Sequence, residues 1–210
     1  FSAKIMIVVQ GGSNYNEYNR QYMINQQKQI DEIKNYDDRF YRISNTTRRT
    51  DASYNDSLAY NFASIAGYTS CPENVQLDLI DNLGYRTEAE CINIVNTSIV
   101  GADSLLGVKY ILSDTPVNGL KPVKDIKGYN GNTVYENPYC LPMTYVIDSF
   151  EQSEYRAKNQ FEFQNEVYSS ILGEQTKLYT KLSATKRKTE DGVIYTVSVP
   201  EGNFAVYGDF

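Results

Sequence analysis

The sequence predicts an α/β (α+β) fold, a mixed β-sheet with flanking helices that is followed by an antiparallel β-strand tail. Segments with helical and with strand-like apolar spacing alternate up to about residue 150, which is typical of helices packed against a sheet. From Thr176 onward the apolar spacing falls to two and turn residues separate the segments, which indicates antiparallel strands.

The best-defined unit covers residues 97–112. Thr97–Leu106 has the apolar spacing of a short helix, and Gly107 can take the left-handed conformation that ends a helix. Val108–Leu112 is rich in β-branched and aromatic residues, as strands are. We therefore expect a helix, a glycine and a strand in immediate succession, with the strand holding the central sheet.

Helices are also predicted at residues 14–34, 70–84 and 159–173. The first begins with a capping box at Asn14 and has a polar face at Gln26–Gln29, so it should cover one side of the sheet. Ser70 and Pro72 predict the cap and first turn of the second, and Asn159 the cap of the third. The expected buried positions are Tyr18, Tyr22, Met23, Ile30, Ile33, Val75, Leu79, Ile80, Leu83, Phe163, Val167 and Ile171.

Further strands are predicted from alternating or β-branched segments. Asp38–Ser44 alternates imperfectly, so we expect a bulge or an edge position there. Thr133–Glu136 should pair with Met143–Ile147 around the turn at Asn137-Pro138. The other expected strands are Lys4–Gln10, Cys91–Val95 (strand or loop), Leu178–Leu182, Val193–Val199 and Phe204–Tyr207.

The change of spacing near residue 150 predicts two domains. Residues 1–150 would form an α/β domain, and residues 151–210 a helix plus antiparallel β segment, packed on the first or beginning a β-sandwich. Because the chain begins at Phe1 without an initiator Met, we expect it to be a piece of a longer protein.

Composition excludes several classes of function. Histidine is absent, which excludes Ser/His/Asp and Cys/His nucleophile systems and His-containing zinc sites. Cys71, Cys91 and Cys140 are too few and too widely spaced for a Cys-only zinc site, and their disulfide state stays open. The chain has no GxGxxG motif and no P-loop, so we expect no cofactor, no metal and no catalytic residue that can be recognised.

Charge and hydropathy limit the partners. A net charge of -6 argues against nucleic acid, which needs a basic stripe. Only Lys186, Arg187 and Lys188 cluster, just before an acidic turn, which favours a solvated hairpin turn. No stretch approaches the ~18 consecutive apolar residues of a membrane span.

Five short motifs follow one another in order across residues 38–173 and resemble one known family. They are Phe40, Tyr41, Arg42 and Ile43; Asn61 with Gly67, Tyr68 and Ser70; Asp103, Leu105, Leu106, Gly107, Val108, Lys109 and Tyr110; Tyr135, Glu136, Asn137, Pro138, Leu141 and Pro142; and Gln164-Asn165. Together they resemble the extracytoplasmic domain of the bacterial membrane protein YfhO family.

The resemblance implies a multi-pass membrane protein that is type C glycosyltransferase-like. Such a protein takes sugar from a polyprenyl-phosphate donor and adds it, outside the membrane, to a cell-envelope polymer such as teichoic acid. The essential acidic residue of that class lies in a loop between membrane helices, which this chain lacks, so the domain should be inactive alone. We expect it to cap the active site of the transmembrane portion of the same polypeptide, or to recognise the glycan acceptor or polyprenyl-linked sugar, on the extracytoplasmic face of the cell membrane.

Four residues of these motifs are candidate contacts for a glycan or a phosphate. Asp103 could accept from sugar hydroxyls or hold a cation, or stabilise the helix before Gly107. Lys109 could pair with Asp103 or meet a phosphate, or snorkel from an edge strand. Asn137 builds the turn or contacts glycan, and Arg42 forms a phosphate clamp or a surface ion pair.

Two other functions stay open on the residues alone. Two carboxylates converging within ~10 Å would suit a glycoside hydrolase, although no pair stands out. A non-catalytic cell-surface carbohydrate-binding or protein-interaction module is the stronger alternative. The 19 tyrosines of the chain could stack on sugars or partners, or they reflect compositional bias with rings half-buried in strands.

Overall fold

A computed structural model describes residues 14–47, 55–68, 73–88, 92–146 and 159–201. Its centre is a four-stranded mixed sheet in the order β1-β5-β7-β6. β1 (Arg42–Asn45) runs parallel to β5 (Val108–Ser113), whereas β7 (Thr133–Glu136) is antiparallel to both β5 and β6 (Lys121–Pro122). The predicted mixed sheet is confirmed.

Two small antiparallel sheets accompany the central one. β2 (Gly67–Tyr68), β4 (Ile92–Ile94) and β3 (Arg86–Glu88) form the first, in the order β2-β4-β3. β8 (Ala184–Thr189) and β9 (Gly192–Val197) form the second, a hairpin that confirms the predicted antiparallel tail. The chain is therefore α+β.

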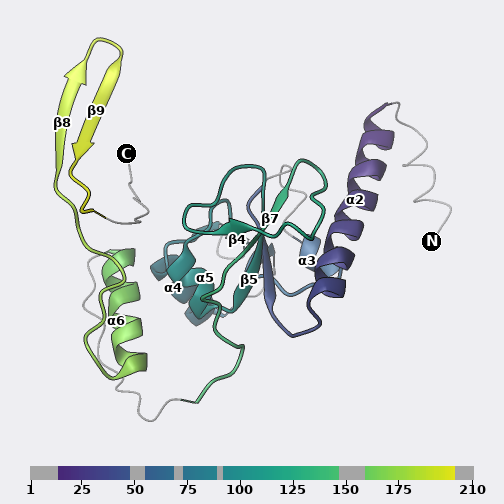
Figure 1. Cartoon of the computed structure of the whole chain (residues 1–210), viewed down its shortest axis with the longest axis horizontal. Coiled ribbons are helices and arrows are strands. Elements are labelled where there is room, and N and C mark those ends of the chain that lie inside the picture. Colours follow the sequence, from purple (N-terminus) through teal and green to yellow (C-terminus); the bar gives the residue numbers. More distant parts are fainter. Residues whose placement is uncertain (1–13, 48–54, 69–72, 89–91, 147–158, 202–210) are drawn as a thin grey trace.

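Helices cover both faces of the central sheet (Figure 1). α2 (Asn14–Tyr36) lies on one side, and α4 (Asn74–Asn82) and α5 (Val100–Leu105) lie on the other. α6 (Gln160–Leu172) joins the second layer, and the single turn α3 (Asp56–Ala59) follows the first loop. Consequently β5 has a core on each face: Ile111 packs with α4, α5 and α6, and Leu112 packs with α2.

The predicted succession of helix, glycine and strand is confirmed at α5 and β5. Gly107 has φ +69°, the left-handed value that a glycine adopts without the strain a Cβ would add. It follows Leu106, which caps α5, and the strand starts at the next residue. Val108, Ile111 and Leu112 have no exposed surface, so β5 is the buried axis of the sheet.

The expected bulge and edge position of the first described strand are both present. β1 is one of the two edge strands of the central sheet, and its register against β5 shifts between Arg42 and Ile43. The strand is shorter than predicted, because the Asp37 carboxylate accepts from the Arg39 backbone N–H (3.2 Å) and holds the preceding residues in a turn.

The polar face predicted for α2 is wrong in part, since two of its glutamines are buried. Gln26 and Gln29 have no exposed surface, whereas the expected core positions Tyr18 and Met23 are 65% and 53% exposed. The Gln29 amide donates to the Lys127 carbonyl (2.9 Å) and accepts from the Tyr129 N–H (2.8 Å). The helix thus packs on the backbone of a loop through its glutamines. The spacing of apolar residues gives no sign of such a contact.

The stripe predicted for α4 also needs correction. Val75 is 77% exposed and Leu79 39% exposed, while Leu77, Ile80 and Leu83 are buried. The helix begins at Asn74 with Glu73 as its N-cap residue, later than predicted, and Pro72 lies outside the described residues. Gly84 ends the helix as expected, with φ +99°.

Met143–Ile147 does not pair with β7, and no strand forms over its described residues 143–146. After β7 the Cys140 N–H donates to the Asn137 carbonyl (3.3 Å), and the Leu141 N–H donates to the Ser104 carbonyl (3.0 Å). The chain is therefore drawn back to α5, and β5 and β6 flank β7 instead.

The C-terminal part combines confirmed and corrected predictions. The Asn159 side chain accepts from the backbone N–H groups of Phe161 (3.1 Å) and Glu162 (3.0 Å), as predicted for an N-cap, and Gly173 ends α6 with φ +68°. Residues 178–182 are not a strand, and the basic residues 186–188 lie within β8 instead of in the turn. The predicted strands Lys4–Gln10 and Phe204–Tyr207 lie outside the described residues, as do Ser70, Cys71 and Cys91.

The buried glutamine gives a direct test of the α2 packing. Gln29→Leu should lower the free energy of unfolding by about 2 kcal/mol, because it removes two hydrogen bonds and leaves a backbone donor and acceptor unpaired. Gln27→Leu, on the exposed side of the same turn, is the control and should change it by less than about 0.5 kcal/mol. Urea unfolding measures both, and equal effects would contradict the packing role.

Candidate functional site

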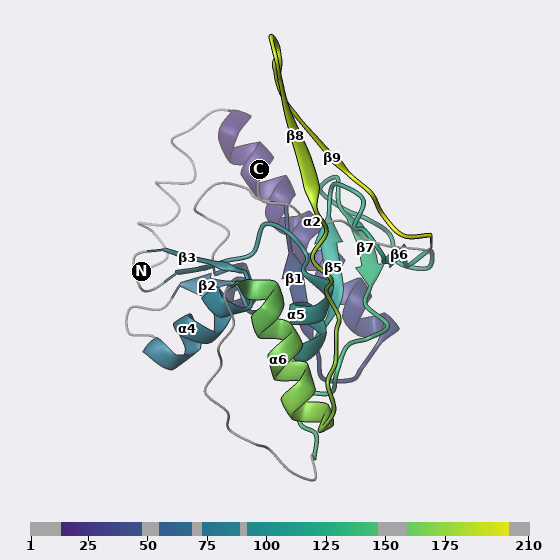
Figure 2. The same ribbon diagram turned by 90° about the vertical axis from the view of Figure 1, so that its left-hand side faces the viewer.

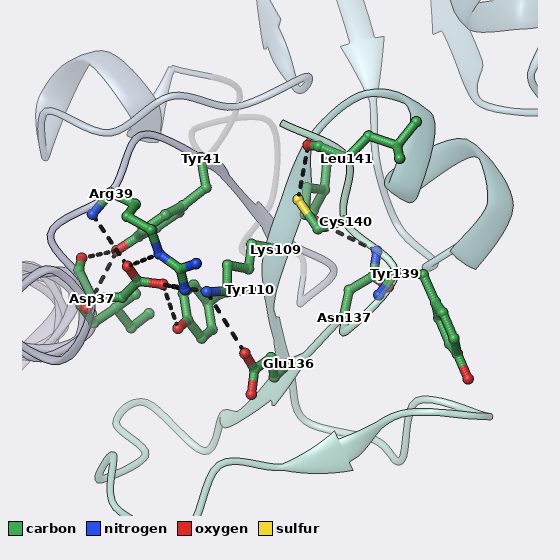
Figure 3. Close-up of polar contacts among 12 residues, drawn as sticks. Asp37, Arg39, Tyr41, Lys109, Tyr110, Glu136, Asn137, Tyr139, Cys140 and Leu141 are labelled. Carbon is green, nitrogen blue, oxygen red and sulfur yellow. Dashed lines mark hydrogen bonds and ion pairs between the residues drawn. The ribbon is translucent and has the colours of Figure 1, made fainter. Parts of the chain in front are cut away.

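Charged side chains gather at the end of the central sheet where α2 leads into β1 (Figure 3). We call Asp37, Arg39, Lys109, Tyr110 and Glu136 the sheet-end cluster. They come from the loop after α2, from the start of β5 and from the last residue of β7. The candidate contacts Arg42 and Asn137 lie beside this cluster, at the same end of the sheet.

Asp37 is the centre of the cluster. Its carboxylate accepts from Arg39 through Nε (2.9 Å) and Nη2 (3.0 Å), from the Tyr110 hydroxyl (3.0 Å) and from the Lys109 ammonium. The Tyr41 hydroxyl donates to the backbone carbonyl of the same residue (2.8 Å). The carboxylate side chain is only 6% exposed, so these protein donors replace water.

The donors fix the charge of Asp37. The Arg39 guanidinium, together with Lys109 and Tyr110, holds the pKa of Asp37 well below its ordinary value of 3.8, although burial opposes this. Burial, together with the same carboxylate, raises the pKa of Tyr110, and burial raises the pKa of Tyr41 to about 12. Asp37 is therefore ionised at physiological pH and is not available as a general acid.

Lys109 is held by two carboxylates. Its ammonium pairs with Asp37 and lies 3.7 Å from Glu136, and its side chain is 12% exposed. Of the alternatives for Lys109, a pair with Asp103 is not seen, because Asp103 lies on α5 and bonds to Tyr85 and Ser98, and β5 is an inner strand of the sheet instead of an edge strand. Because two carboxylates already compensate the positive charge of the ammonium, it is a weak site for a phosphate.

Asp103 is completely buried. The hydroxyls of Tyr85 and Ser98 each donate to one of its carboxylate oxygens at 2.5 Å. Burial raises the pKa of Asp103 to about 6, against the lowering effect of these two donors. Without solvent contact the carboxylate has no surface to present to a glycan, and its contacts tie α5 to the segment before β3.

Asn137 anchors the turn that follows β7. It is 1% exposed, and its amide donates to the Val108 carbonyl (3.0 Å) and to the Ser104 hydroxyl (3.1 Å). Its side-chain oxygen accepts from the Tyr139 N–H (3.1 Å). This geometry matches the turn-building interpretation, and all of these partners are internal.

Arg42 differs from the other three candidates. It is half-buried on β1, and its Nη1 donates to the Leu106 carbonyl (2.5 Å) and to the Met143 sulfur (3.2 Å). No carboxylate pairs with it in the described part of the chain, so the expected surface ion pair is not seen there. Burial lowers its pKa, and its remaining N–H groups keep donor capacity.

The structure thus brings all four predicted residues around the junction of α5 and β5. Arg42 reaches Leu106, Asn137 bonds to Val108 and Lys109, and Asp103 is on the preceding helix. Sequence reasoning missed Asp37, Arg39 and the role of Glu136. The signal for the first two was an Asp two residues before an Arg, directly after a long helix, a spacing that suits an Asx turn closed by an ion pair.

Exposed aromatic rings and a pocket accompany the cluster. Phe40 is 73% exposed and Tyr139 is 65% exposed. An open pocket of about 440 Å³ lies between the loop after α2 and residues 61–63, and Phe40, Asp38 and Asn61 line it together with Phe62 and others. Asn61 has a left-handed backbone (φ +54°), and the Lys34 ammonium donates to its carbonyl.

No catalytic arrangement results from these groups. Asp37 stays ionised, and Asp103 has no contact with solvent, so neither can act as general acid on a substrate. Cys140 is a free thiol whose pKa is raised by burial, which does not favour the nucleophilic thiolate. Within the described ranges no group of three or more acidic or cysteine side chains could hold a metal ion.

Fold and site therefore define an α+β domain in which an ionic cluster joins the elements at one end of a sheet. A family model described as "Bacterial membrane protein YfhO" matches residues 2–200, and the chain belongs to this family, as its motifs indicated. Membership indicates a membrane glycosyltransferase-like protein. Among curated proteins and among solved structures nothing matches. None of the described helices is long and apolar enough to cross a membrane.

The central role of Asp37 can be tested by substitution. Asp37→Asn should lower the free energy of unfolding at pH 7 by about 3 kcal/mol, because it removes the nearest anion from a buried ammonium. Asp38→Asn, an exposed neighbour, should cost less than about 0.5 kcal/mol.

The pH dependence supplies a second readout for the same pair of variants. Since the pKa of Asp37 is lowered in the folded state, its contribution is present above about pH 4 and is lost as the pH falls further. Wild type and Asp38→Asn should therefore lose stability between pH 4 and pH 2 more steeply than Asp37→Asn. Urea unfolding at pH 4, 3 and 2 measures this loss, and an equal loss of unfolding free energy in all three proteins would contradict the prediction.

Asp103 should produce the opposite dependence in another range. Because its folded pKa is raised to about 6, the folded state binds its proton more tightly, and stability falls as pH rises from about 4 to 6. The rise from 3.8 corresponds to about 3 kcal/mol. Asp103→Asn should abolish this decline, and the exposed control Asp81→Asn should retain it. Chemical denaturation at pH 4, 5, 6 and 7 would show whether it does.

Proposed function

We propose that this chain is a non-catalytic, extracytoplasmic recognition domain of a membrane glycosyltransferase-like protein. In this proposal it receives the acceptor, a phosphate-containing cell-envelope polymer such as teichoic acid, and holds it for the transmembrane portion of the same polypeptide. The observation that carries the proposal is the guanidinium of Arg42, which has no carboxylate partner among the described residues.

The guanidinium is positioned for an anion. One nitrogen is fixed by a backbone carbonyl and a methionine sulfur, so the side chain loses little further freedom when a ligand binds. The remaining N–H groups form the planar fork that binds phosphate with two hydrogen bonds. Partial burial strengthens such bonds relative to those in water.

Sugar units of the polymer would meet the exposed rings nearby. Phe40 lies two residues before Arg42, and Tyr139 belongs to the turn after β7 that is bonded back to α5, the helix whose end Arg42 contacts. Each ring offers a flat apolar face, and Tyr139 adds a hydroxyl. Phosphate recognition by Arg42 and ring contact by these aromatic residues fit a polymer that alternates both groups.

The two carboxylates that lie buried near the candidate residues support a recognition role over hydrolysis at this site. Asp37 and Asp103 are both committed to internal bonds. In this proposal, chemistry belongs to the membrane portion, and the domain contributes by raising the local concentration and fixing the orientation of the acceptor.

Binding to a defined polymer tests the proposal. Short poly(glycerol phosphate) should bind the chain, and Arg42→Gln should weaken binding about tenfold, as expected for losing one charge-assisted bidentate contact. Arg20→Gln on α2 removes an equally charged side chain far along the helix and should change affinity less than twofold. Isothermal titration calorimetry measures the affinities, and urea unfolding confirms that the variants are folded.

Two outcomes would reject acceptor recognition at Arg42. One is that wild type does not bind the polymer, and the other is that both arginine variants lose affinity equally. Arg42→Lys separates geometry from charge, because it keeps the cation without the planar fork.

The pocket beside Phe40 favours a second candidate, a carbohydrate-binding module that recognises uncharged glycan. Its lining combines aromatic rings with the Asp38 carboxylate and the Asn61 amide, groups that suit a sugar ring and its hydroxyls. Binding of a neutral glycan that persists in Arg42→Gln and is lost in Asn61→Ala would favour this function.

A further inference from the structure

The hairpin formed by β8 and β9 extends away from the rest of the chain (Figures 1 and 2). Every residue of β8 is exposed, and in β9 only Val197 is partly buried. The hairpin is thus a projecting ribbon with both faces open over most of its length. Its turn, at Glu190 and Asp191, forms the tip.

The two strands of the ribbon have different chemistry. β8 carries three consecutive cations, and β9 carries three consecutive apolar or aromatic residues. Register pairs them one to one: Lys186 with Tyr195, Arg187 with Ile194, and Lys188 with Val193. The Lys186 ammonium also lies over the Tyr195 ring, 5.3 Å from its centre. The β8 edge of the ribbon therefore carries the basic residues and the β9 edge the apolar ones, while paired residues share a face and each face carries both kinds.

This basic edge stands out against an acidic protein. Residues 176–200 contain five basic and two acidic residues, a net charge of +3, while the whole chain has -6. Val193 and Ile194 are 46% and 44% exposed, and no other described element forms a sheet with the hairpin.

We propose that the β8–β9 hairpin binds the anionic lipid surface of the membrane. The apolar edge at Val193 and Ile194 enters the boundary between headgroups and acyl chains, and the basic edge at residues 186–188 lies at the level of the lipid phosphates. Long basic side chains suit this position, since their stems cover apolar surface while their charges reach the headgroups. This site is separate from Arg42 and does not depend on the proposed acceptor role.

Two observations favour a bilayer over a protein partner. The cations and the apolar residues lie on opposite edges and on both faces, which matches the polarity gradient across a membrane interface better than it matches a flat protein surface. In addition, the chain belongs to a family of membrane proteins, so a bilayer is a constant neighbour. The acidic tip argues for binding by the edge, because a tip-first approach would place Glu190 and Asp191 against anionic lipid.

Vesicle binding by the whole 210-residue chain tests the inference. Sedimentation with vesicles of 30% phosphatidylglycerol in phosphatidylcholine should retain the protein, and pure phosphatidylcholine should retain at least tenfold less. The triple variant Lys186→Gln, Arg187→Gln and Lys188→Gln should bind the anionic vesicles at least tenfold more weakly. The double variant Val193→Ser and Ile194→Ser should bind them about fivefold more weakly.

A matched control distinguishes the hairpin from general charge. Lys28→Gln, Lys121→Gln and Lys124→Gln remove the same charge from exposed positions on the body and should change vesicle binding less than twofold. An equal loss in this control, equal binding to neutral vesicles, or no vesicle binding by wild type would each overturn the inference. Affinity for poly(glycerol phosphate), measured on the same hairpin variants, shows whether a failure concerns the hairpin or the acceptor site.

Discussion

The carboxylate of Asp37 is the interaction on which this end of the structure depends. It accepts hydrogen bonds from side chains of the α2–β1 loop and of β5, and through Lys109 it is connected to Glu136 on β7. A single buried charge thereby fixes the end of a long helix relative to three strands. Because removing one partner would leave another charge buried, the cluster behaves as a unit, and its cost of desolvation is met only when every donor is in place. The sheet-end cluster is therefore an architectural element, and it explains why most of the conspicuous charges in this region are unavailable to a ligand.

Because the charges of the cluster are paired with one another, Arg42 is the candidate residue whose charge has no such partner among the described residues. Lys109, Asp103 and Asn137 lie in the same region, yet each has its hydrogen-bonding capacity used by neighbours in the fold. Arg42 occurs where the register of β1 shifts, so its side chain is aimed at the end of α5 instead of continuing the alternation of the strand. The register shift that disturbs the alternation of β1 thus also positions the Arg42 guanidinium, whose other N–H groups are available to a ligand. The proposed recognition of a phosphate-bearing polymer rests on this cation and on the exposed rings of Phe40 and Tyr139.

Sequence patterns predicted those parts of the fold that depend on local rules. The α5, Gly107 and β5 succession, the Asn159 cap and the edge position of β1 follow from capping, backbone conformation and alternation, each of which is encoded within a few residues. The failures have a different cause. Gln29 is buried because a loop about 100 residues later presents backbone groups to it, and residues 143–146 leave the sheet because Leu141 bonds to Ser104. Asp37 was missed for the same reason, since its partners Lys109 and Tyr110 are 72 and 73 residues away. Tertiary partners of polar groups decided these features, and apolar periodicity carries no information about them.

The two buried carboxylates show why a perturbed pKa alone does not identify an active site. Opposite shifts in a pair of acids are a recurrent sign of acid and base roles, and here the pKa of Asp37 is lowered while that of Asp103 is raised. Catalysis would also require that both face one substrate. Asp37 bonds to the Tyr110 side chain, which belongs to the core under α2, whereas Asp103 bonds to Tyr85, which belongs to the core under α4 and α5. The sheet separates the two cores, and Asp103 has no surface at all. Each shift is the consequence of burying a carboxylate among internal partners, so neither shift marks a catalytic acid, which agrees with the proposed recognition role.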